Sequence, residues 1–123
     1  MTLLELFLDI CSWVLFVVGG AGVLTGAIGV VRFPDFYSRL HAAGVTDTAG
    51  AELILFGMLI QLFRMDMDAA LTGPLLVYVA KIVFIGFFLF LTSPVSTHAI
   101  AHSAWVGGLK PLVGKELERE EEN

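Results

Sequence analysis

The sequence predicts an all-α integral membrane protein with three transmembrane helices and with short interfacial helices after the first and third spans. Two observations lead to this fold class. Of the 123 residues, 57% are hydrophobic and only 15% are charged, whereas soluble domains average about 45–50% apolar and about 25% charged residues. Long uncharged stretches also recur at lengths near the roughly 20 residues that cross a bilayer. A small soluble fold could not bury this much apolar surface.

Charge and cysteine content exclude several other classes of protein. Seven Lys and Arg against twelve Asp and Glu give a net charge of −5, which argues against a nucleic-acid binder. The single cysteine, Cys11, cannot form an internal disulfide, and no Cys/His spacing predicts a metal site. No nucleophile elbow, P-loop or HExxH motif is present. We therefore expect no catalytic residues, no metal, no cofactor and no enzymatic activity.

The first span is predicted over residues 8–32, because residues 10–31 carry no formal charge. Residues 1–9 include Glu5 and Asp9 but no basic residue, unlike the start of a cleavable signal peptide. Pro34 ends the span, since the residue before a proline is disfavoured in the α region. A short amphipathic helix over residues 35–43 is expected to lie along the membrane surface.

The second and third spans are predicted over residues 46–64 and 71–92. Residues 53–63 are uncharged but too few to cross alone, so the second span includes Asp47 and Glu52. Ser93 and Pro94 favour a helix start after the third span, which predicts a short helix over residues 95–105. One membrane domain then covers residues 1–105, and residues 106–123 form an acidic cytoplasmic tail.

The distribution of basic residues predicts the orientation. With three spans, the N-terminus and the loop after the second span lie on the same side, where Arg64 is the one basic residue. The opposite side is rich in basic residues and is therefore expected to be cytoplasmic. This places the N-terminus outside and the C-terminus inside. The basic residues of the predicted cytoplasmic side are Arg32, Arg39, Lys110, Lys115 and Arg119.

A stripe of glycines on the first span predicts close helix packing. At about 100° per residue, four glycines fall within roughly an 80° arc, and small residues at such spacing let helix backbones approach in lipid. The alternative is that glycine is simply common in membrane helices. The sequence leaves open whether the neighbouring helix belongs to this chain. The stripe consists of Gly19, Gly22, Gly26 and Gly29.

The charged residues within the spans are candidates for ion-path or polar partner contacts. Carboxylates at membrane depth are costly and are usually paired or functional, so Asp47 and Glu52, with Thr48, could line an ion or proton path. Alternatively, Asp47 caps the second helix at the interface, and Thr48 and Glu52 lie in its first turns. Lys81 in the third span either extends toward the outer interface or pairs with a buried acid.

Three segments carry a family resemblance. The run RFPDFYSRLHAA, which begins at Arg32, is followed by DTAG from Asp47, and the later LTSPV from Leu91 is followed by His98. Together they resemble the G subunit of Mrp-type monovalent cation/proton antiporters, also called Mnh or Pha. The resemblance covers roughly residues 10–105.

The resemblance implies a three-helix subunit of a hetero-oligomeric complex in the prokaryotic cytoplasmic membrane. Such complexes contain six or seven different subunits and exchange Na⁺, and sometimes K⁺ or Li⁺, for protons. The expected role is to support assembly, with possible contact to the cation path. A purely structural subunit is the alternative within transport, and a small self-assembling, holin-like pore is the alternative outside it.

The resemblance also assigns a structural or assembly role to the residues that match the family pattern. Glu52 lies outside that pattern. The matching residues are Arg32, Pro34, Asp35, Arg39 and His41 in the loop after the first span, and Pro94 and His98 at the exit of the third.

Overall fold

The computed structural model describes residues 2–65 and 73–111, and it is helical along nearly all of that length. Its elements are α1 (Leu3–Arg32), α2 (Phe36–Gly44), a π-helical segment η1 (Val45–Gly50), α3 (Ala51–Met65) and α4 (Gly73–Val106). Three stretches are long and apolar enough to cross a membrane. The predicted three-span, all-α fold class is therefore confirmed, although two of the expected helix breaks are not.

Local signals set both ends of α1. Thr2 caps its start: the Glu5 amide donates to Thr2 Oγ1 at 3.2 Å, and the Thr2 amide donates to Glu5 Oε2 at 2.8 Å. This reciprocal capping box satisfies amides that have no partner within the helix. The helix ends at Arg32, and Phe33 is extended, as expected before a proline.

A separate interfacial helix over residues 35–43 was expected, and this is wrong. The Asp35 carboxylate caps α2, accepting from the amides of Tyr37 at 3.1 Å and Ser38 at 3.2 Å. Beyond the cap, Gly44 and Ala51 both keep right-handed helical dihedrals, so α2, η1 and α3 form one continuous rod. No proline or left-handed glycine interrupts it. The predicted amphipathic helix is thus continuous with the second span, in the apolar stretch Phe36–Arg64.

The break predicted at Pro94 is also wrong, because Pro94 lies inside α4. A proline removes one backbone donor and crowds the preceding turn, yet transmembrane helices tolerate this where neighbouring groups compensate. The helix ends instead where Gly108 adopts a φ of +88°. The amides of Gly108 and Leu109 donate back to Trp105 and Ala104 in a Schellman pattern, each at 3.0 Å. Residues 71–72 and the tail from 112 onward lie outside the described residues.

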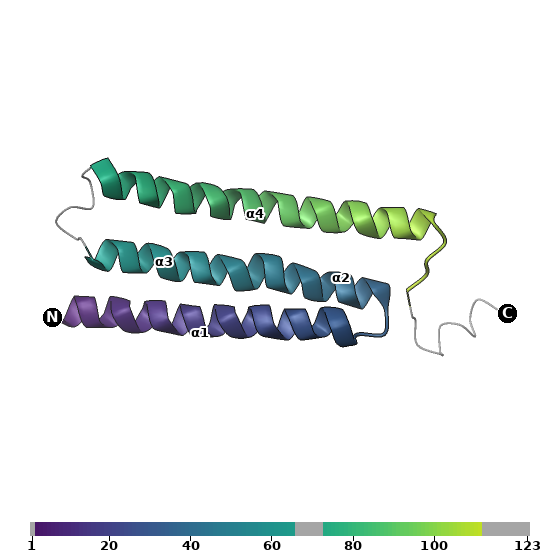
Figure 1. Ribbon diagram of the computed structural model, residues 1–123, viewed down its shortest axis with the longest axis horizontal. Helices are drawn as coiled ribbons and strands as arrows, with labels where there is room; N and C mark the ends of the chain where they lie inside the picture. Colours follow the sequence, from purple (N-terminus) through teal and green to yellow (C-terminus); the bar gives the residue numbers. More distant parts are fainter. Residues whose placement is uncertain (1, 66–72, 112–123) are drawn as a thin grey trace.

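The three rods lie side by side, with the α2–η1–α3 rod between α1 and α4 (Figure 1). The N-terminal end of α1 lies beside the end of α3, and the turn from α1 to α2 lies at the end where α4 finishes (Figure 1). At that end the Tyr37 hydroxyl donates to the Leu109 carbonyl at 2.8 Å. The middle rod therefore has one face toward each neighbour, and these two seams hold most of the polar groups described below.

Candidate functional site

The glycine stripe of α1 faces the middle rod of the same chain. A Cβ added at Gly19 would lie 2.9 Å from the Gly50 carbonyl oxygen, and one at Gly29 would lie 2.8 Å from the Ala42 Cβ. At Gly26 the added atom would lie 2.7 Å from the Ala42 carbonyl oxygen. Gly22 is slightly looser, with the Gly50 Cα at 3.5 Å. The seam that the sequence predicted is therefore intramolecular.

A polar cluster that sequence analysis missed joins α1 to α3 at one end of that seam. Arg64 Nη1 lies 3.1 Å from Asp9 Oδ1. Gln61 Nε2 donates to the same carboxylate at 2.9 Å and to Ser12 Oγ at 2.7 Å. Ser12 is fully buried. A usable signal existed, because three spans place Asp9 and Arg64 on the same side of the membrane, but their pairing depends on helix rotation.

On the other face of the middle rod, η1 contacts α4 through a hydroxyl pair. Thr48 Oγ1 donates to Ser93 Oγ at 2.9 Å. The pair borders a cavity of about 590 Å³ between α2, η1 and α4, and His41 and His98 line the same cavity. Thr48, His41 and His98, which sequence analysis singled out separately, are therefore brought together on one seam. Pro94 also lines this cavity.

Asp47 lies in the π-helical segment and its side chain is exposed. It follows Phe36, the first residue of the rod, by about three helical turns, so it is not in the first turn of the second span. The interpretation that Asp47 caps this helix at the interface is wrong, because Asp35 provides the cap. Asp47 is therefore an exposed carboxylate in the middle third of the apolar stretch Phe36–Arg64. π-Helical turns are rare and are frequently found at functional sites.

Glu52 lies roughly midway along the second span and points toward α4. Its Oε2 would lie 3.2 Å from a Cβ at Gly86, so the missing side chain of Gly86 leaves room for the carboxylate. Oε1 is buried and has no hydrogen-bond partner. A carboxylate near the bilayer centre costs about 2.5–3.5 kcal/mol on insertion scales. The alternative that placed Glu52 in the first turns of the helix is also wrong.

Glu52 lines an open apolar groove between α3 and α4. The groove has a volume of about 600 Å³, and Thr48 at its edge also borders the α2–α4 cavity. Except for Thr48 and Glu52, its lining side chains are apolar, and they include Phe56 of α3 and Phe87 and Phe90 of α4. The single carboxylate is therefore surrounded by hydrocarbon on both walls.

Lys81 does not neutralise Glu52 within the described part of the chain. It lies on the exposed surface of α4, with Nζ 5.9 Å from the Tyr78 ring centroid. Tyr78 is one turn nearer the beginning of α4. The Lys81 side chain can therefore extend toward the beginning of α4. It does not pair with the Glu52 carboxylate.

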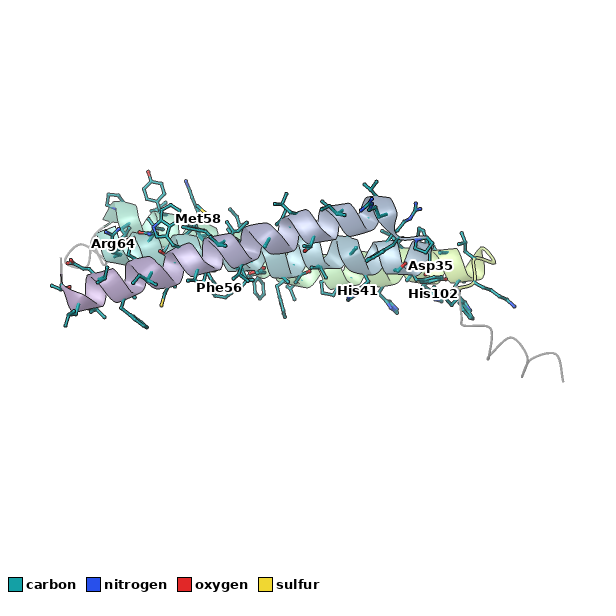
Figure 2. The ribbon with its side chains drawn as sticks, turned by 90° about the horizontal axis from the view of Figure 1, so that it is seen from below. Asp35, His41, Phe56, Met58, Arg64 and His102 are labelled. Carbon is teal, nitrogen blue, oxygen red and sulfur yellow. The ribbon has the colours of Figure 1, made fainter. Side chains whose placement is uncertain are left out.

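The residues of the predicted loop motif hold the turn between α1 and α2. Arg32 is the last residue of α1, and Arg39 Nε donates to the Phe33 carbonyl at 2.6 Å across that turn. Asp35 and His41 lie at the same end of the molecule as His102, and Arg64 lies at the opposite end (Figure 2). On α4 the rings of His98 and His102 are stacked, with centroids 6.4 Å apart. These groups stabilise or line one end of the helices, and none is arranged as a catalytic pair.

Comparisons with known proteins agree on one family. The family model described as "Na+/H+ antiporter subunit" matches residues 15–105. The chain is 32% identical to the Na⁺/H⁺ antiporter G subunit of Alkalihalophilus pseudofirmus, over 89% of this chain and 81% of that protein. It is 34% identical to the corresponding G1 subunit of Staphylococcus haemolyticus, over 75% of this chain and 71% of that protein.

A solved structure shows the same fold within an assembly. A chain of the Mrp complex from Dietzia matches with a TM-score of 0.68 and 25% identity, over 94% of this chain and 93% of that one. The family model covers most of the helical region, including the turn motif, the π-helical segment and Pro94. The chain belongs to the family of Na⁺/H⁺ antiporter G subunits.

Proposed function

We propose that this chain is a membrane-embedded subunit of a hetero-oligomeric antiporter that exchanges Na⁺ for protons, and that its π-helical segment borders the cation path. The role is one of transport and assembly rather than enzymatic catalysis. The observation that carries the cation-path proposal is the exposed Asp47 carboxylate within the apolar stretch Phe36–Arg64. Na⁺ and H⁺ are the transported species, and the partners are the other subunits of the complex.

The shape of the chain supports a role within an assembly. The three rods form one layer (Figure 1), and the buried hydrophobic core among the described residues consists of Ala42 and Leu75. Large apolar side chains stay exposed, including Trp13 at 60%, Phe84 at 63% and Phe90 at 60%. Lipid or neighbouring subunits must cover these faces, and membrane helices associate through such packing surfaces.

The chemistry of the π-helical segment supports contact with a cation. Asp47 supplies carboxylate oxygens, and the neighbouring Thr48 supplies a hydroxyl that is held in place by its bond to Ser93. Oxygen ligands of this kind suit hard cations such as Na⁺. Thr48, but not Asp47, also lines the α2–α4 cavity, whose wall includes His41 and His98 at the basic end of the molecule. An exposed intramembrane carboxylate requires water, a cation or a polar partner.

Basic residues support the orientation that we propose in the prokaryotic cytoplasmic membrane. Arg32, Arg39 and Lys110 lie at or beyond the end where α1 stops and α4 finishes, and Arg64 is at the opposite end. By the positive-inside rule the first end faces the cytoplasm. The N-terminus is then outside and the C-terminus inside, and the α2–α4 cavity is nearer the cytoplasmic surface.

The cation-path proposal is tested with Asp47→Asn in the assembled complex. In inverted membrane vesicles, we expect the Na⁺ concentration for half-maximal proton exchange to rise, because the amide removes a charge but keeps the side-chain size. Asp35→Asn is the matched control: asparagine caps helices about as well as aspartate, so exchange should stay unchanged. Co-purification of the other subunits verifies assembly in both variants.

Each result has a defined meaning. Unchanged Na⁺ dependence in an assembled Asp47→Asn complex would leave the chain as a purely structural subunit. Purification of the tagged wild-type chain without any other antiporter subunit would instead contradict the assembly role and favour a self-assembling pore.

A further inference from the structure

We infer that the α3–α4 groove receives a transmembrane helix of another subunit, and that a lysine or arginine of that helix pairs with Glu52. The inference rests on the proposed assembly but concerns a different site from Asp47. It starts from a conflict within the chain. Glu52 occupies the middle of a span, its Oε1 is buried and unpartnered, and its surroundings in the groove are hydrocarbon.

The first step is that no basic residue described in the chain resolves this conflict. Arg64 is paired with Asp9, and Arg39 donates to the Phe33 carbonyl beyond the far end of the rod. Lys81 lies on the exposed surface of α4, beside Tyr78. Arg32 ends α1 and Lys110 follows α4, so both are remote from the middle of the second span. A partner for Glu52 must come from outside the described residues.

The second step is that the chain accommodates the carboxylate at this position. Gly86 is buried, and a Cβ there would lie 3.2 Å from Glu52 Oε2 and 3.8 Å from Oε1. A larger residue there would crowd the carboxylate, which would have to shift. The carboxylate therefore lies beside Gly86 of α4 with no bond that holds it, while the groove next to it stays open. This arrangement suits a contact that is completed by another molecule.

The third step identifies the occupant. The groove runs along both helices, from Thr48 to Leu59 on one wall and from Ile82 to Phe90 on the other. Such an elongated apolar surface suits a helix that lies parallel to the rods and inserts its side chains. A lipid chain would match the hydrocarbon walls but would leave the carboxylate without a partner. Charge complementarity with Glu52 therefore favours a helix that carries a basic residue at this depth.

The first measurement is site-specific photo-crosslinking in the assembled complex. A benzophenone amino acid replaces Phe87, which lines the groove, or Phe84, which is exposed outside it. We expect the Phe87 probe to crosslink to one transmembrane segment of another subunit, with a lysine or arginine near its middle. The Phe84 probe should not label that segment. Labelling of lipid alone, of a second copy of this chain, or of a segment without a basic residue would overturn the inference.

The second measurement is charge reversal. Glu52→Lys should reduce co-purification of the crosslinked subunit roughly tenfold or more, because removing one partner of a buried ion pair leaves the other charge uncompensated. Replacing the basic residue of that subunit with glutamate should restore it. Glu52→Gln, which keeps the side-chain shape, should also weaken co-purification. It is the variant to use if Glu52→Lys prevents membrane insertion. Full co-purification with both variants would overturn the inference.

These outcomes separate the inference from the proposed function. An intact complex with both Glu52 variants would rule out the inferred ion pair and would leave the antiporter role unaffected. Loss of all antiporter subunits from the wild-type preparation would contradict the antiporter role itself. A changed Na⁺ dependence in Asp47→Asn, with an unchanged groove crosslink, would support the two sites as independent.

Discussion

Substitution of Gly26 by alanine tests the α1 seam most sharply. The added Cβ would lie 2.7 Å from the Ala42 carbonyl oxygen and 3.0 Å from the Thr46 amide nitrogen, and closer still to the Thr46 hydroxyl. Two of these three neighbours are backbone atoms, which cannot rotate away. Relief therefore requires that α1 and the middle rod separate locally, although the rest of the seam holds them together.

The expected magnitude follows from overpacking. Extra methyl groups in a well-packed interface cost about 1–3 kcal/mol, while alanine gains about 1 kcal/mol over glycine from helix propensity. Gly20→Ala isolates the propensity gain, because a Cβ at Gly20 meets no heavy atom within 4 Å. The difference in the free energy of unfolding between the two variants therefore equals the overpacking cost. It corresponds to roughly a 5–150-fold change in the unfolding equilibrium constant.

The assay is an SDS titration of each purified variant in mild-detergent micelles, with the free energy of unfolding compared at one reference SDS fraction. We expect Gly26→Ala to unfold at a lower SDS fraction than Gly20→Ala. Equal midpoints would refute the close approach of α1 to the middle rod at this position. They would also mean that the glycine stripe reflects only the general enrichment of glycine in membrane helices.

Three further predictions use the same assay. Thr48→Val and Ser93→Ala should each lower the free energy of unfolding by about 1 kcal/mol. The double variant should lose less than the sum of the two single losses, because one hydrogen bond joins the two side chains. Strict additivity would contradict that bond. Gln61→Leu should cost about 1–2 kcal/mol, since it removes donors to Asp9 and Ser12, and wild-type stability would argue against the cluster. Gly108→Ala should cost about 1–2 kcal/mol, because alanine is strained at a φ of +88°, and faster amide exchange near the end of α4 should accompany the loss.

The number of spans followed from the sequence because hydrocarbon thickness sets a length that uncharged stretches must reach. The boundaries were harder. The uncharged residues 53–63 are too few to cross, so the sequence predicts a start at residue 46, which takes Asp47 and Glu52 into the span. The helix instead begins at Phe36, where Asp35 caps it. Hydropathy weighs each residue alone, whereas the position of these acids depends on a backbone that remains helical through Gly44.

The candidate site was predicted in its residues but not in its geometry. Helical phase could place four glycines on one face of α1, but it could not identify the middle rod as their neighbour. The same limit separated Thr48 from Ser93, whose contact depends on how α4 lies against η1. The cluster of Asp9, Gln61 and Arg64 depends on the rotation of two helices about their axes. Pairing between spans is a property of tertiary packing, which a single sequence encodes only indirectly.

A structure of the assembled complex, with its waters and lipids resolved, would show whether Asp47 lies on the cation path. We predict that the Asp47 carboxylate lines a hydrated passage between this chain and a neighbouring subunit, next to the Thr48–Ser93 pair. An Asp47 side chain sealed against apolar residues, or facing lipid with no water or polar group beside it, would contradict a place on the cation path.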